Sequence, residues 1–228
     1  MNFSVTKDGK ELNSSLYTWD EATKTFSTKE NNLVLDFSSI DEVTFKTGSY
    51  CTFKTGHRCT FKTGSYCTFK TGFDCTFKTG HRCTFDTGSD CTFKTGYDCT
   101  FDTDSYCTVK TGYDCTFDTG FNCTFDTDSY CTFKTGSYCT FKTGSYCTFD
   151  TCFGCTFKTG SYCNLVVGSI KDFNLGAGSF IILRMKDKDL DYRLINNKKE
   201  AIMYLKSSND VERFQSECII KDIDFVIK

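Results

Sequence analysis

The chain has 228 residues, 39% of them hydrophobic, and a formal net charge of −2. This length is enough for one or two domains, and the charge is too close to neutral to predict a nucleic-acid binder. No apolar stretch is long enough to span a membrane, and no basic region followed by an apolar run opens the chain. We therefore expect a cytoplasmic protein with reduced thiols.

Residues 1–34 predict a β-rich N-terminal cap. Leu16–Trp19 and Lys24–Thr28 are rich in strand-forming residues and flank Asp20–Thr23, a pattern typical of a hairpin. The end of a stacked β-structure exposes unpaired strand groups and must be covered. We expect Trp19, the only Trp of the chain, to cover the open end of the core.

An eight-residue unit, Cys-Thr-Phe-Lys/Asp-Thr-Gly-x-x, repeats without a gap from Val43 to Tyr162. We call this unit the octad; a fixed short period is typical of a solenoid. Position 4 is Lys in some octads and Asp in others, so it must face water. Strand parity then turns positions 1, 3 and 5 (Cys, Phe and Thr) inward. The octad therefore predicts an all-β fold, a parallel β-solenoid. The pattern fades at both ends, which places the solenoid at residues 35–176.

The number of octads per coil is two or three. At position 4, alternate octads beginning with Val43 carry seven Lys and one Asp, and the intervening octads carry three Lys and four Asp. This segregation favours two octads per coil, with alternate octads on opposite faces. Three octads per coil is the alternative, because the corners His57-Arg58 and His81-Arg82 are 24 residues apart.

The last three positions of the octad predict a turn. Gly at position 6 is expected to take a positive φ. Positions 7 and 8 follow a swap rule: Ser is usually followed by Tyr, as in Ser65-Tyr66, whereas Phe or Tyr is followed by Asp or Asn, as in Tyr97-Asp98. One aromatic side chain per corner is therefore expected, with the two His-Arg corners as exceptions.

Residues 177–228 lack the octad and predict a small α+β region, either a C-terminal cap or an interaction module. Phe180–Met185 and Leu190–Ile195 predict a hairpin. Lys198–Lys206 has helical apolar spacing, and Ile219–Ile227 alternates as a strand.

Fifteen of the 17 cysteines stand one octad apart. Thiolates at regular spacing are suitable ligands for soft metals, so a metal-thiolate protein is a less favoured alternative. Structural zinc sites use close pairs with four convergent ligands, however, and Cys152 and Cys155 are the only C-x-x-C pair. Inward parity beside Phe favours buried structural thiols, so neither a metal nor a cofactor is predicted.

Ice binding and catalysis are also less favoured. A flat ice-binding array needs two outward Thr per strand, whereas Thr52 and Thr55 have opposite parity and Lys54 shares the outer face with Thr52. Both His lie in corners followed by Arg, and carboxylates such as Asp86 are repeat positions. Because a catalytic residue is normally singular, we predict that the chain is not an enzyme.

Charge is unevenly distributed along the solenoid. Residues 43–82 hold seven basic residues against one Asp, a net charge of +6, and residues 83–130 hold two Lys against nine Asp, a net charge of −7. The basic half is a candidate contact for anions or for the acidic middle of another copy. Its residues are Lys46, Lys54, Arg58, Lys62, Lys70, Lys78 and Arg82. A protein partner or self-association is therefore expected, and nucleic acid and membranes are not.

The run TFKTGSYCTFKTGHRCTFKTG, Thr44–Gly64, resembles uncharacterised octapeptide-repeat proteins of large DNA viruses of amoebae and of some phages. The resemblance covers about residues 43–162. It implies a viral or microbial origin and a repeat β-solenoid, and it supplies no catalytic residues. If the origin is viral, the expected location is the host cytoplasm or the virion.

These observations predict a non-enzymatic structural or interaction protein, with the solenoid as a rigid spacer or display surface. The alternative is a macromolecule-binding viral effector that uses the basic half or the C-terminal module.

Overall fold

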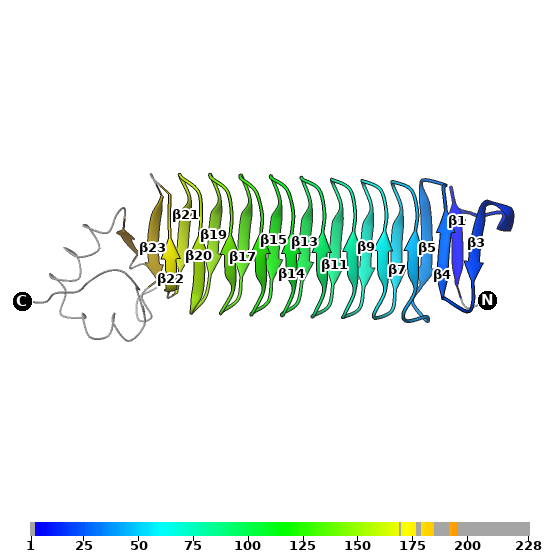
Figure 1. The fold of residues 1–228 in the computed structure, drawn as a ribbon, viewed down its shortest axis with the longest axis horizontal. Helices are drawn as coiled ribbons and strands as arrows, with labels where there is room; N and C mark the ends of the chain where they lie inside the picture. Colours follow the sequence, from blue (N-terminus) through cyan, green and yellow to red (C-terminus); the bar gives the residue numbers. More distant parts are fainter. Residues whose placement is uncertain (1–2, 169, 177–178, 185–191, 196–228) are drawn as a thin grey trace, which may run out of the picture. The chain divides into compact units, whose positions relative to one another are not determined.

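The computed structural model describes residues 3–168, 170–176, 179–184 and 192–195 (Figure 1). These residues form strands and short turns, with one 3₁₀ turn, η1 (Ser14–Leu16), among them. The all-β prediction is therefore confirmed. The chain divides into two compact units, Met1–Thr119 (unit 1) and Gly120–Lys228 (unit 2). This division falls inside the octads, and the domain boundaries expected at 34/35 and 176/177 stay predictions.

Unit 1 begins with five strands that precede the first octad. They are β1 (Ser4–Lys7), β2 (Lys10–Glu11), β3 (Tyr17–Asp20), β4 (Thr25–Thr28) and β5 (Leu33–Phe37). Strand β1 pairs antiparallel with both β2 and β5. Strands β3 and β4 form an antiparallel hairpin with Trp19 opposite Phe26, which confirms the hairpin predicted across Asp20–Thr23.

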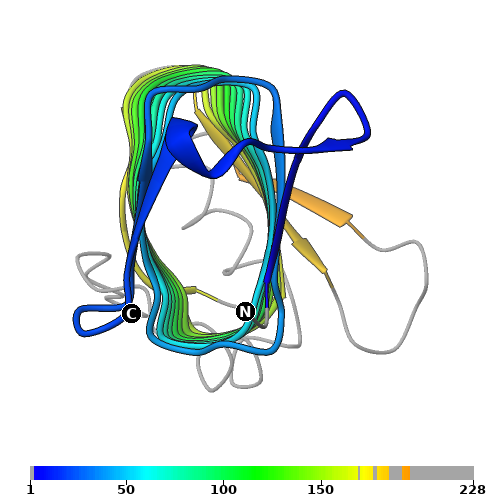
Figure 2. The same cartoon turned by 90° about the vertical axis from the view of Figure 1, so that its right-hand side faces the viewer.

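Ten octad strands of unit 1 alternate between two sheets. Sheet A contains β7 (Thr52–Thr55), β9 (Thr68–Thr71), β11 (Thr84–Thr87), β13 (Thr100–Thr103) and β15 (Thr116–Thr119). Sheet B contains β6 (Thr44–Lys46), β8 (Thr60–Lys62), β10 (Thr76–Lys78), β12 (Thr92–Lys94) and β14 (Thr108–Lys110). Seen end on, each coil of unit 1 is a flattened loop whose long sides are these two sheets (Figure 2).

Strands within each sheet are parallel and in register at a separation of 16 residues. Phe53 lies beside Phe69, and Phe61 lies beside Phe77. Two octads per coil is therefore confirmed and three per coil is wrong. The 24-residue spacing of the His-Arg corners places them on opposite sides of the coil instead.

Unit 2 has the same coil. One of its sheets contains β16 (Thr124–Asp126), β18 (Thr140–Lys142), β20 (Cys155–Lys158) and β22 (Ile170–Asn174). The other contains β17 (Thr132–Thr135), β19 (Thr148–Thr151), β21 (Asn164–Val167), β23 (Phe180–Arg184) and β24 (Tyr192–Ile195). Antiparallel pairing of β23 with β24 confirms the C-terminal hairpin. The helix expected at 198–206 and the strand expected at 219–227 lie outside the described residues.

The core is a double column of phenyl rings flanked by thiols. Phe53 and Cys51 are at most 1% exposed, which confirms the predicted inward parity. Phe53 stacks on Phe69 of the same sheet at 4.9 Å and meets Phe61 of the opposite sheet edge-on at 5.4 Å. Offset-stacked and edge-to-face pairs are the favoured arrangements of aromatic rings, so Phe53 has favourable ring neighbours in both sheets.

The expectation that Gly at position 6 takes a positive φ is wrong. The positive φ falls at position 8 of every octad, for example at Tyr66 (58°) and Asp74 (58°). Gly is favoured at position 6 because the coils approach closely there, although Asp104, Asp128 and Cys152 occupy this position in three octads. A Cβ added to Gly64 would overlap Ser49 Oγ and lie 3.1 Å from the Ser49 backbone nitrogen.

An aromatic cluster closes the core at the N-terminal end of unit 1. Phe3 stacks on Phe37 with ring centroids 4.3 Å apart. Trp19 lies 5.2 Å from Phe3 and 5.9 Å from Phe37, so it covers the end of the core as predicted. The sequence analysis missed Phe3, which makes the direct contact, because Phe3 stands outside any repeating pattern.

Candidate interaction surfaces

A single row of lysines runs along the outer face of sheet B in unit 1. Neighbouring lysines pair in register across consecutive strands, one rung or about 4.8 Å apart. All are exposed at the surface. We call this set the lysine column: Lys46, Lys62, Lys78, Lys94 and Lys110.

The outer face of sheet A carries a row of mixed sign. Lys54 and Lys70 come first, and three in-register carboxylates, which we call the acidic column, follow: Asp86, Asp102 and Asp118. Lys54 lies 3.7 Å from Asp36, and Lys70 lies 3.2 Å from Asp86. Ion pairs therefore compensate the two lysines of this face.

The seven basic residues predicted from the sequence do not form one surface. Three belong to the lysine column on sheet B, and Lys54 and Lys70 lie on sheet A. Arg58 follows a sheet A strand and Arg82 follows a sheet B strand, so they lie at opposite corners of the coil. Both arginines are paired, Arg58 with Asp74 at 3.7 Å and Arg82 with Asp98 at 2.8 Å.

The sequence analysis left Lys94 and Lys110 out of the candidate surface. They continue the lysine column in register with Lys78. Consecutive octads lie on sheets A and B in turn, so the net charge of a continuous segment combines residues of both faces. The lysine column contains only residues of alternate octads. The unequal lysine content of alternate octads was the signal that could have identified the whole column.

Exposed aromatic side chains stack along the corner that follows the sheet B strands. Tyr50 and Tyr66, both at position 8, stack at 4.7 Å. Tyr97 and Tyr113, both at position 7, stack at 4.9 Å. The swap rule thus reflects two alternative aromatic rows, and position 8 takes a positive φ whether it holds Tyr or Asp, as at Tyr66 and Asp98.

The corner at His81-Arg82 joins the two kinds of row. His81 stacks on Tyr97 at 4.7 Å, whereas the Arg82 guanidinium lies 5.5 Å above the Tyr66 ring. Arg82 Nη1 donates to the Tyr66 hydroxyl at 2.7 Å and Nε donates to Asp98 Oδ2 at 2.8 Å. The hydrogen bond to Tyr66 contributes most and that to Asp98 contributes next, and together they raise the pKa of the Arg82 guanidinium. The His-Arg exception is therefore a structural junction.

Position 7 also supplies hydrogen-bond acceptors to the next coil. The backbone N–H of His81 donates to Ser65 Oγ at 3.1 Å, and the Ser65 hydroxyl lies 3.1 Å from His81 Nδ1. At the other corner the backbone N–H of Phe73 donates to His57 Nδ1 at 3.1 Å. Both imidazoles are thus engaged in holding neighbouring coils together.

The periodic thiols are buried and donate to backbone carbonyls. Cys59 Sγ, for example, donates to the His57 carbonyl at 3.4 Å. A hydrogen bond with Cys123 lowers the pKa of Cys139, but a contact with Cys155 and burial outweigh it and raise the pKa to about 11. Cys152 is exposed. Within the described ranges, no group of three or more Cys, His, Asp or Glu side chains is arranged to hold a metal ion.

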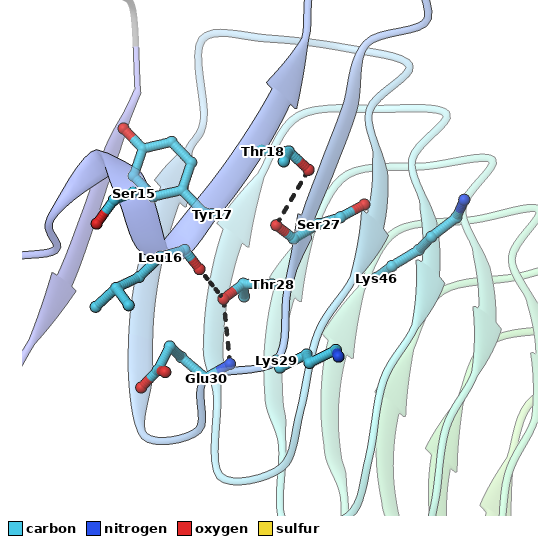
Figure 3. Close-up of a pocket in the computed structure, with 9 residues that line it drawn as sticks. All are labelled: Ser15, Leu16, Tyr17, Thr18, Ser27, Thr28, Lys29, Glu30 and Lys46. Carbon is cyan, nitrogen blue, oxygen red and sulfur yellow. Dashed lines mark hydrogen bonds between the residues drawn. The ribbon is translucent and has the colours of Figure 1, made fainter.

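An open groove of about 490 Å³ lies over hairpin β3–β4 (Figure 3). Thr28 Oγ1 donates to the Leu16 carbonyl at 2.7 Å and accepts from the Glu30 backbone N–H at 3.1 Å, which shapes its floor. The groove is lined by Ser15, Leu16, Tyr17, Thr18, Ser27, Thr28, Lys29, Glu30 and Lys46. Because Lys46 begins the lysine column, the groove and the column are continuous.

In the part of the chain that the structure describes, no helix has the length and apolar character needed to cross a membrane. Comparisons with protein-family models, with curated proteins and with solved structures found no match.

Proposed function

We propose that this chain is a non-enzymatic structural or interaction protein whose solenoid holds outward side chains at fixed spacing for a partner. The observation that carries the proposal is the register of the outer columns, in which each lysine of sheet B lies beside the lysine of the next strand. Repeat solenoids commonly present such extended surfaces to other macromolecules.

The core supports this role because it fixes the spacing of the surface. Stacked rings such as Phe61 and Phe77, 4.8 Å apart, lie directly beneath the outward lysines of the same strands. A surface held in place by two hydrogen-bonded sheets loses little backbone entropy on binding, which favours affinity. The repeat is thus suited to display.

The histidines and the carboxylate that could act in catalysis are engaged in contacts within the protein. Nδ1 of His57 accepts a backbone hydrogen bond, and Nδ1 of His81 lies beside the Ser65 hydroxyl. Asp86 pairs with Lys70 on the exposed face of sheet A. These contacts support a non-enzymatic role, and the buried thiols support the proposal that the protein works in a reducing cytoplasm.

Affinity capture tests this proposal. The full chain and a variant with Lys62→Ser and Lys78→Ser are immobilised and exposed to the same host lysate, beside a variant with Lys10→Ser and Lys24→Ser outside the octads. We expect the column substitutions, and not the control substitutions, to remove specific partners. Identical sets of captured proteins for all three chains would contradict a displaying role of sheet B.

The second candidate is a viral effector that binds an anionic macromolecule. The lysine column favours it, because Lys46, Lys62, Lys78 and Lys94 form no ion pair among the described residues. The proposed C-terminal module lies mostly outside the described residues. Retention on immobilised polyphosphate that falls steeply with salt, and falls further on Lys62→Ser and Lys78→Ser, would support this candidate.

A further inference from the structure

Two columns of opposite charge lie on the two sheets of unit 1. The lysine column follows sheet B and the acidic column follows sheet A. Like charges directly opposite each other in neighbouring strands repel and destabilise the pairing. Lys46, Lys62 and Lys78, which lie in register on neighbouring strands, therefore repel one another, and a partner of opposite charge would relieve this repulsion.

We infer that a second copy of this chain is that partner, with its acidic column against the lysine column of the first. The inference deepens the proposed function, because it names the partner that the displayed surface binds. Both columns are built on the same rung spacing of about 4.8 Å. The carboxylates of one copy are therefore commensurate with the lysines of the other along the whole contact, which a partner of different repeat is not.

The coil geometry permits this contact without rotating either copy. Sheets A and B form the opposite long sides of each coil of unit 1 (Figure 2). A sideways translation of a copy thus brings its sheet A face onto the sheet B face of its neighbour. Such a head-to-tail contact uses different surfaces on the two copies and leaves one of each free, so it continues into an open row of molecules.

The charges also favour one particular displacement of the second copy along the coil axis of the first. Without a shift, Lys54 and Lys70 of the second copy face the first two lysines of the lysine column and repel them. A shift of two coils places the acidic column opposite the first three lysines instead. Lys54 and Lys70 then face Thr18 and Ser27 of hairpin β3–β4, which continue the outer row of sheet B below Lys46.

The expected association is weak in each contact and sensitive to salt. Exposed ion pairs are individually weak, and salt screens them at separations beyond about 8 Å at physiological ionic strength. Three aligned pairs act together only because the solenoid holds them in register. We therefore expect self-association at low ionic strength and its loss at several hundred millimolar salt.

Sedimentation velocity of the full chain under reducing conditions, over a concentration series at about 20 and 300 mM NaCl, tests the inference. Two matched variants have the same net charge: Lys62→Glu with Lys78→Glu reverses the lysine column, and Lys54→Glu with Lys70→Glu extends the acidic column. We expect the wild type to associate at low salt only. The first variant should associate about tenfold more weakly, and the second at least as strongly as the wild type.

Mixing gives a complementary test. A variant with Asp86→Lys and Asp102→Lys should associate about tenfold more weakly than the wild type, as should the variant with Lys62→Glu and Lys78→Glu. The mixture should associate more strongly than either alone, because the intact lysine column of the first variant meets the intact acidic column of the second. If circular dichroism shows that a charge-reversed chain is unfolded, the neutral pair Lys62→Gln and Lys78→Gln replaces it and should also weaken association.

Three results would overturn the inference: a wild type that is monomeric at every concentration in low salt, equal behaviour of the two matched variants, or no association in the mixture. A monomeric wild type that still loses captured lysate partners on Lys62→Ser and Lys78→Ser would overturn self-association and leave the proposed function standing.

Discussion

His81 and Tyr97 stack with their ring centroids 4.7 Å apart and their planes 2° apart, while the neighbouring Arg82 turns back to Tyr66. One two-residue corner thus ends a row of rings at position 8 and begins a row at position 7. The junction explains why His81-Arg82 stands outside the swap rule, and the stack on Tyr97 can be tested separately from the hydrogen bonds of Arg82.

Removing the His81 ring should remove its stack on Tyr97, its edge contact with Tyr66 and its hydrogen bond with Ser65. His81→Ser keeps an acceptor at position 7 but leaves Tyr97 without this ring neighbour, and we expect a loss of about 0.5–1.5 kcal/mol in the free energy of unfolding. His81→Phe keeps the stack and should lose less. Urea unfolding followed by circular dichroism measures both, and a larger loss for His81→Phe would show that the hydrogen bond to Ser65 dominates.

Close approach of the coils at position 6 predicts a graded response to Ala substitution. A Cβ on Gly64 would overlap Ser49 Oγ, whereas a Cβ on Gly112 would lie 3.3 Å from Tyr97 Cβ. We expect Gly64→Ala to destabilise the chain by about 1–3 kcal/mol, as overpacking does, and Gly112→Ala to cost less. Thermal unfolding of the two variants compares them, and equal melting temperatures would show that the corner relaxes freely.

Much of the coil could be predicted from the sequence because position 4 reports the outer face directly. Lys or Asp at that position fixed the parity of Cys51, Phe53 and Thr55, and the lysine content of alternate octads indicated two octads per coil. Both conclusions hold in the structure. A local property repeated in every octad is readable without knowing how the coils stack.

The corners and the candidate surface were less predictable because they depend on neighbouring coils. Gly64 is small because of Ser49 in the preceding coil, and the positive φ falls at Tyr66 instead. Likewise Lys54 and Lys62 occupy position 4 of consecutive octads but lie on opposite sheets. Relations between residues 16 apart emerge only once the coil length is known.

A buried hydroxyl in the first coil predicts a stabilising substitution. Thr55 Oγ1 is buried and has no hydrogen-bond partner, whereas Thr63 Oγ1 donates to the Gly64 carbonyl at 3.4 Å. Replacing an unsatisfied buried hydroxyl by a methyl group of the same shape removes a desolvation penalty. We expect Thr55→Val to raise the free energy of unfolding by about 1 kcal/mol and Thr63→Val to give no gain. Chemical denaturation measures the free energy of unfolding of both variants. An equal gain in stability for Thr55→Val and Thr63→Val would contradict the conclusion that, of the two, only the Thr55 hydroxyl lacks a hydrogen bond.

The buried thiol of Cys139 predicts a loss of stability at alkaline pH. The pKa of Cys139 is raised to about 11 in the folded chain, above the value of about 8.5 for a free thiol. The folded state therefore holds its proton more tightly than the unfolded state, so this contribution is fully present below pH 8.5 and is lost as the pH rises to 11. The difference corresponds to about 3 kcal/mol for this one group.

Urea unfolding at pH 7.5, 9 and 10.5 under reducing conditions measures this loss. Cys139→Ala lowers stability at every pH by leaving a small cavity, but its stability should fall less between pH 7.5 and 10.5 than that of the wild type, because one titrating thiol is gone. A wild type whose stability falls no more between pH 7.5 and 10.5 than that of Cys139→Ala would show that the folded coil does not hold the Cys139 thiol protonated.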